Sequence, residues 1–163
     1  MSTWQVIAST LASEFSDLND VEQATRVTLR IVLAAVLGGL LGLEREVHGQ
    51  AAGVRTHMLV ALGSALFVLV PGFASGEPDA MSRVIQGVVA GVGFLCAGTI
   101  LKESGAAQVK GLTTAAGIWL TAAIGMTVGL GREATALLAT LLALLILNVL
   151  PDLIKRLENR VPK

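Results

Sequence analysis

The sequence predicts an all-α integral membrane protein, with five transmembrane helices after a short N-terminal amphipathic helix. Its 163 residues are 53% hydrophobic and 15% charged, whereas soluble domains carry about 25% charged residues. Five apolar runs alternate with short polar links. Glycines recur inside these runs. Interior glycine is costly in a soluble helix, but in lipid it lets two helices approach closely.

The N-terminal segment, residues 1–25, is expected to form the amphipathic helix. Large apolar residues recur there at helical spacing: Trp4, Ile7, Leu11, Phe15 and Leu18. Its polar side is neutral to acidic, so anionic lipid should not attract it as it attracts basic helices. Two interpretations stay open, a helix lying at the membrane interface and a helix packed on the rest of the protein.

Residues 26–150 are expected to form one transmembrane domain. The five predicted spans are residues 26–43, 56–70, 84–101, 112–130 and 134–150. Pro71 and Pro151 should end the second and fifth spans, because proline lacks the N–H that a helix interior needs. The segment 73–83 then reads as a link, and residues 151–163 as a basic cytoplasmic tail.

The stretch from residue 86 to residue 125 is the expected packing centre, because it holds two glycine-rich apolar runs around a polar link at 102–110. Small residues four apart favour close helix packing in lipid. These contacts could lie within one chain or build a homo-oligomer, most simply a two-fold dimer. The predicted helix-packing positions are Gly38, Gly42, Gly87, Gly91, Gly93, Gly98, Gly111, Gly125 and Gly129.

The distribution of basic residues predicts the orientation. Eight of the twelve Lys and Arg residues lie in the links 44–55 and 102–110 and in the tail. Cytoplasmic loops carry the excess of Lys and Arg. The C-terminus should therefore be cytoplasmic and the N-terminus outside.

Several function classes are disfavoured. The net charge is zero, and no basic stripe suggests a nucleic-acid partner. The single cysteine, Cys96, excludes an intrachain disulfide. No nucleophile or ATP-binding motif is present, so we expect neither an enzyme nor a primary pump.

Polar residues gather on the side assigned to the cytoplasm and form a candidate site for a cation or a partner. Mutual ion pairing near the membrane surface is the alternative. Among cations, Mg²⁺ suits such a hydrated mouth, because it binds few carboxylates and keeps several waters. The sequence contains no dedicated metal-binding motif, so no cofactor is expected with certainty. The candidate residues are Glu44, Arg45, Glu46, Arg55, Glu103, Thr113, Thr114 and Asn148.

Three of these polar positions carry specific expectations. A carboxylate such as Glu44, at the C-terminal end of a helix, opposes the helix dipole and needs a cationic partner or a bound cation. Arg55 is the expected partner, because Arg45 is adjacent and points elsewhere on the helix. Asn148 should bond a neighbouring helix rather than a ligand. His48 and His57 lack the spacing of a zinc site.

Five segments together resemble the MgtC/SapB family of bacterial membrane proteins. They are GLERE at 42–46, GVRTHMLVALGSALF at 53–67, GVGFLCAGTIL at 91–101, VKGLTTAAGIW at 109–119 and AAIG at 122–125. The chain departs from the family pattern at Cys96, where glycine is usual. The resemblance implies five spans, the bacterial inner membrane and a link to magnesium limitation. The soluble ACT-like C-terminal domain of some members is expected to be absent.

Two classes of function follow. In one, the protein conducts or transports Mg²⁺ or another cation. In the other, it is a non-transporting regulator that contacts another membrane complex through its helices. The sequence places no charge securely at mid-membrane, which disfavours a pump with an intramembrane proton relay.

Overall fold

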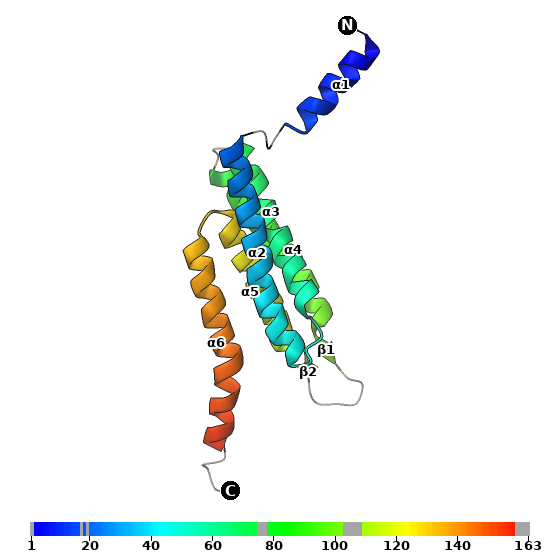
Figure 1. Ribbon diagram of the computed structural model, residues 1–163. Coiled ribbons are helices and arrows are strands. Elements are labelled where there is room, and N and C mark those ends of the chain that lie inside the picture. The colour runs from blue at the N-terminus through cyan, green and yellow to red at the C-terminus, as the bar shows by residue number, and fades with distance from the viewer. Residues whose placement is uncertain (1, 17, 19, 75–77, 103–108, 159–163) are drawn as a thin grey trace.

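A computed structural model describes residues 2–158, except 17, 19, 75–77 and 103–108 (Figure 1). The chain forms an isolated helix, α1 (Thr3–Glu14), and a bundle of five longer helices. The bundle helices are α2 (Val21–Val47), α3 (Val54–Ala74), α4 (Pro78–Thr99), α5 (Leu112–Gly129) and α6 (Glu133–Glu158).

Helix α1 stands away from the bundle and buries none of its residues. The structure therefore shows α1 unpacked, and its place at the membrane interface stays a prediction. Trp4 and Phe15 remain 79% and 81% exposed. An unpartnered apolar surface of this kind suits a membrane interface.

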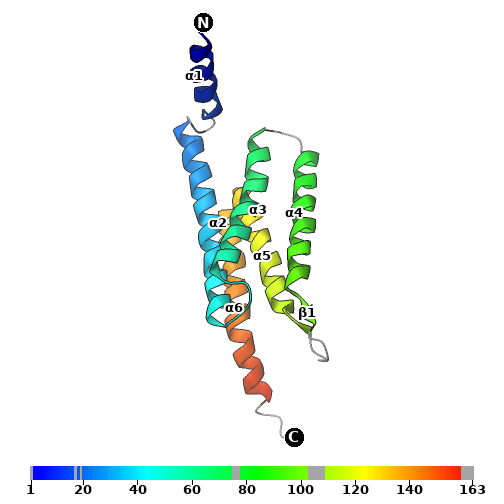
Figure 2. The same cartoon turned by 90° about the vertical axis from the view of Figure 1, so that its right-hand side faces the viewer.

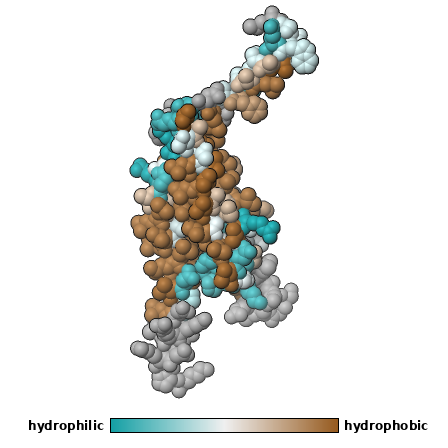
Figure 3. Space-filling view, viewed as in Figure 1, coloured by the Kyte–Doolittle hydropathy of each residue, from teal (hydrophilic) through white to brown (hydrophobic). Residues whose placement is uncertain are grey.

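Four of the bundle helices, α2, α4, α5 and α6, are long and apolar enough to cross a membrane. The apolar part of α3, Val54–Val70, is shorter. The face of the bundle in Figure 3 has a broad apolar belt between two polar bands, as a lipid-facing surface requires. The fold is that of an all-α membrane protein, as predicted.

The prolines do not end helices where the sequence predicted. Helix α3 continues through Pro71 to Ala74, and α6 continues through Pro151 to Glu158. Helix α4 begins at Pro78, inside the expected link. Proline is favoured at the first helical position, where its missing N–H costs nothing. Inside a membrane helix the single lost hydrogen bond is tolerated, because local adjustments satisfy the freed carbonyl.

Helix α3 is central because glycines on two neighbours make room for it. A Cβ at Gly42 of α2 would lie 2.6 Å from the Cα of Val54, at the start of α3. On the other side, a Cβ at Gly125 of α5 would collide with the carbonyl of Ala61. Ala61 and Ala65 are themselves fully buried. Two of the predicted glycine pairs, Gly38–Gly42 and Gly125–Gly129, thus pack helices within the chain.

The glycines of α4 behave differently. Among the described residues, nothing lies within 4 Å of a Cβ built at Gly87, Gly91, Gly93 or Gly98. Only 11% of the apolar window of α4 is buried, against 56% for α5. Within the chain α5 is therefore the packed helix, while α4 leaves its glycines open, and a packing role for them against another chain stays a prediction.

One end of the bundle carries a hairpin in which β1 (Leu101–Lys102) pairs antiparallel with β2 (Val109–Lys110). Gly111, at φ +91°, follows β2 and lies against the backbone of Thr99. The α2–α3 connection and the C-terminal part of α6 share this end (Figure 2). We call it the hairpin end; it holds the links that the sequence assigned to one side of the membrane.

Candidate functional site

Glu44 and Arg45 form a buried ion pair in the last turns of α2, at the hairpin end. They are 9% and 6% exposed. The Nη1 atom of Arg45 lies 3.4 Å from Oε2 of Glu44. His48 approaches the other carboxylate oxygen, with Nδ1 3.1 Å from Oε1. The carboxylate thus has the cationic partner that its place at a helix C-terminus requires.

The predicted partner of Glu44, Arg55, was wrong. Arg55 is exposed on the first turn of α3, and no ion pair of Arg55 occurs among the described residues. The expectation treated Arg45 as pointing elsewhere because adjacent helical residues diverge. The arginine stem is long enough to reach back to its neighbour, and burial of both groups favours that contact.

Glu46 has a structural role at the start of α3. Its Oε2 accepts a hydrogen bond of 2.8 Å from the backbone N–H of Val54. A carboxylate here satisfies a free N–H and complements the positive end of the helix dipole. Glu46 also lines a shallow polar hollow of about 300 Å³ with Gln50, Arg55 and Thr56.

The other predicted site residues fall in different places. Thr114 is buried and its hydroxyl donates to Oε1 of Gln50 at 3.3 Å, which ties α5 to the α2–α3 connection. Asn148 is exposed on α6 and donates to the carbonyl of Leu144 in its own helix, not to a neighbour as expected. Glu103 lies outside the described residues.

His57 is a buried polar residue that the sequence reasoning considered only as a zinc ligand. It is fully buried, and its Nδ1 lies 3.0 Å from the carbonyl of Gly53. A carbonyl only accepts, so Nδ1 donates and Nε2 is the acceptor of the neutral ring. Among the described residues, no hydrogen-bond partner lies within reach of the buried Nε2. The Gly38–Gly42 pair could have indicated this buried histidine, because His57 packs against both glycines.

Arg45 and His57 line the same small cavity, of about 170 Å³, between α2, α3, α5 and α6. Thr113, which is otherwise exposed, also lines it. The Nε atom of Arg45, like Nε2 of His57, is buried and has no hydrogen-bond partner in the part of the chain that the structure describes. The charged side chain on the wall of this cavity is the cation Arg45, and none of the described residues that line it is a carboxylate. No group of three metal-ligating side chains occurs in the part of the chain that the structure describes.

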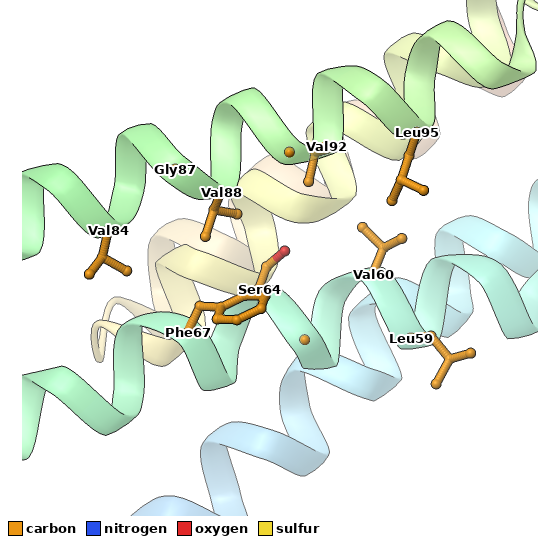
Figure 4. A pocket seen from close by; sticks show the side chains of 11 residues that line it. Leu59, Val60, Ser64, Phe67, Val84, Gly87, Val88, Val92 and Leu95 are labelled. Carbon is orange, nitrogen blue, oxygen red and sulfur yellow. The ribbon is translucent and has the colours of Figure 1, made fainter.

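A second hollow of about 580 Å³ opens between α3 and α4 (Figure 4). Apart from the hydroxyl of Ser64, its walls are apolar side chains and glycines. Phe67 and Val60 line it from α3, and Val84 and Val88 line it from α4. We call this hollow the α3–α4 groove.

The helices and their apolar belt define the class, a multi-pass membrane protein. The chain belongs to the MgtC family, whose family model matches residues 31–156. Protein SrpB of Synechococcus elongatus is 48% identical over 75% of this chain and 73% of its own length.

Two further relatives have longer chains. YhiD of Escherichia coli, named as a candidate magnesium transporter, is 41% identical over 81% of this chain and 64% of its own length. Protein MgtC of Salmonella typhimurium is 40% identical over 82% of this chain and 56% of its own length. This chain therefore spans only part of both relatives. No solved structure matches the chain.

Proposed function

We propose that this protein acts in magnesium homeostasis in the bacterial inner membrane, as a regulator that contacts another membrane protein through its helices. The role in magnesium homeostasis rests on membership of the MgtC family and on the name given to the relative YhiD. The mode of action rests on the α3–α4 groove.

The groove carries this proposal because it is an unfilled surface of the kind that membrane helices use to associate. Gly63 of α3 and Gly87 and Gly91 of α4 line it, and each has open space where a Cβ would stand. Without a hydrophobic driving force between helices in lipid, close backbone approach at such small residues drives association. A transmembrane helix of a partner would fill this space and bury the glycines.

The second candidate is conduction of Mg²⁺, which the buried carboxylate of Glu44 favours. An ionisable residue within a membrane-spanning helix is a candidate functional residue by default. The pairing with Arg45 and His48 supports the regulatory proposal instead, because the carboxylate already has cationic or hydrogen-bonding partners. An incoming cation would have to displace them.

Growth in low magnesium, in a strain that depends on the protein, tests the groove. Gly91→Leu places a large side chain in the groove, where open space should let the variant fold. Gly93→Leu is the matched control, because Gly93 is equally open on the same helix but does not line the groove. We expect Gly91→Leu to abolish growth at an unchanged membrane level, with Gly93→Leu growing normally. Normal growth of both variants would reject a role for the groove.

A further inference from the structure

We propose that the cavity between Arg45 and His57 binds a phosphate group that carries a hydroxyl, either inorganic phosphate or the headgroup of a phosphomonoester lipid. Two residues that line it, Arg45 and His57, each have a side-chain nitrogen, Nε and Nε2, that is buried without a hydrogen-bond partner among the described residues. Buried polar groups are almost always satisfied in proteins. Two such atoms in residues that line one cavity therefore point to a ligand.

The guanidinium of Arg45 sets the charge of the ligand. Its bond from Nη1 to Glu44 is long, at 3.4 Å, where charge-assisted bonds span about 2.7–2.9 Å. On the edge formed by Nε and the second terminal nitrogen, Nε has no hydrogen-bond partner among the described residues. Two parallel N–H groups on this edge match two oxygens of a phosphate. The N-terminal turn of α5, which carries Thr113 into the cavity wall, adds its positive dipole end.

His57 selects among oxyanions. With Nδ1 donating to Gly53, Nε2 of the neutral ring accepts a hydrogen bond. A ligand that satisfies both residues must accept from Arg45 and donate to His57. A protonated phosphate monoanion or phosphomonoester does both, whereas sulfate and a phosphodiester lack the hydroxyl.

The remaining walls of the cavity are compatible with both sources of the phosphate group, a lipid headgroup and the free anion. A water molecule fills about 30 Å³ of liquid, so a cavity of about 170 Å³ holds a tetrahedral oxyanion. Ala143, Ile146 and Leu147 of α6 line one side, and Ile146 is 54% exposed. An acyl chain could lie along this side of α6 while its headgroup enters the cavity. Free phosphate would instead enter from the hairpin end, past Thr113.

Binding to the purified full chain tests the site, with thermal unfolding and native mass spectrometry as readouts. The probes are inorganic phosphate in detergent and phosphatidic acid in lipid discs, with sulfate and phosphatidylglycerol as the analogues without a hydroxyl. We expect saturable binding of one or both phosphate probes and at least about tenfold weaker binding of the matching analogue. Saturation by inorganic phosphate identifies the free anion as the source, and binding of phosphatidic acid alone identifies lipid.

Two variants assign the binding to this cavity. Arg45→Gln should weaken it at least about tenfold, while Arg55→Gln, an equal charge change outside the cavity, should not. Because Arg45→Gln disturbs the pair with Glu44, Gly117→Leu serves as a second variant. A Cβ at Gly117 lies an ordinary 3.6 Å from Nε2 of His57, so Gly117→Ala should bind and Gly117→Leu should fill the cavity. Binding that survives both Arg45→Gln and Gly117→Leu, equal binding of the analogues, or no saturable binding would overturn the proposal.

Discussion

Gly38 of α2 lies directly against the backbone of His57 on α3, where a Cβ would stand 2.6 Å from the carbonyl oxygen of His57. Real Cβ atoms essentially never come this close to another heavy atom. The contact shows what the Gly38–Gly42 pair does: it brings α2 and α3 together and seats a buried histidine between them.

Gly38→Ala should therefore destabilise the bundle, because backbone cannot move aside as a flexible side chain can. We expect a lower melting temperature of the detergent-solubilised protein, with Gly125→Ala behaving in the same way against Ala61. Gly98→Ala is the control, since it has open space and replaces a poor helix former at a gain of up to about 1 kcal/mol. Equal stability of Gly38→Ala and Gly98→Ala would contradict the helix packing described here.

Arg30 should hold the turn between α5 and α6. Its Nη1 donates to the carbonyl of Gly129 at 3.1 Å, and its Nε lies 3.5 Å from Oε1 of Glu133. Arg30→Gln should lower the melting temperature more than Glu133→Gln does, because the partly exposed ion pair contributes only about 0–1 kcal/mol while the carbonyl loses its donor. Indistinguishable effects of the two changes would assign the role of Arg30 to the ion pair alone.

The pairing of Glu44 with Arg45 leads to a double-variant test. If the pair is structural, Glu44→Gln and Arg45→Gln should each reduce the membrane level, because breaking a buried pair costs about 3–5 kcal/mol. The double change should then restore part of that level. If the pair also serves the function, each single change should abolish low-magnesium growth while the protein persists. Measuring the amount of the protein in the membrane together with growth separates these outcomes. Full growth with Glu44→Gln would show that Glu44 is not needed for the function.

A second copy of the chain is the alternative occupant of the α3–α4 groove, and such a dimer would use α4. The pairs Gly38–Gly42 and Gly125–Gly129 are occupied within the chain, which leaves Gly87 and Gly91 for contacts with another copy. If a second copy fills the groove, cross-linking in native membranes should trap a dimer that Gly91→Leu weakens. A dimer unaffected by Gly91→Leu, together with lost growth, would instead assign the groove to a different membrane protein.

The orientation predicted from Lys and Arg can be checked by labelling with a membrane-impermeant maleimide. The background is Cys96→Ala, which removes the single cysteine. Ser2→Cys and Ala51→Cys then place exposed thiols before α1 and in the α2–α3 connection. From the outer face of the membrane, we expect labelling of the first and protection of the second. The reverse pattern would invert the topology.

Much of the fold could be predicted from the sequence because hydrophobic length and link composition are local properties. The helix ends at Pro71, Pro78 and Pro151 could not, since tertiary context decides whether a proline starts, interrupts or ends a helix. The glycine pattern predicted close packing but not its partners. Gly125 and Gly91 look alike in sequence, yet one faces the backbone of Ala61 and the other faces open space.

The sequence predicted which residues belong to the candidate site, but not which of them contact one another. Glu44 and Arg45 were placed at the end of a helix, but their pairing depends on how far the bundle buries them. The cavity that joins Arg45 to His57 draws on four helices. Such an arrangement leaves no local signature, because it arises only when separate segments pack together.

Magnesium flux through the purified protein in liposomes is the most direct test of the regulatory account. A Mg²⁺-sensitive dye inside the vesicles reports entry after Mg²⁺ is added outside, and protein-free vesicles give the background. If the protein acts through helix contacts, Mg²⁺ entry should match that background at every Mg²⁺ concentration. A cooperative thermal unfolding curve of the same preparation serves as the control that the protein is folded. Saturable entry above background that Glu44→Gln abolishes would show conduction and contradict the account.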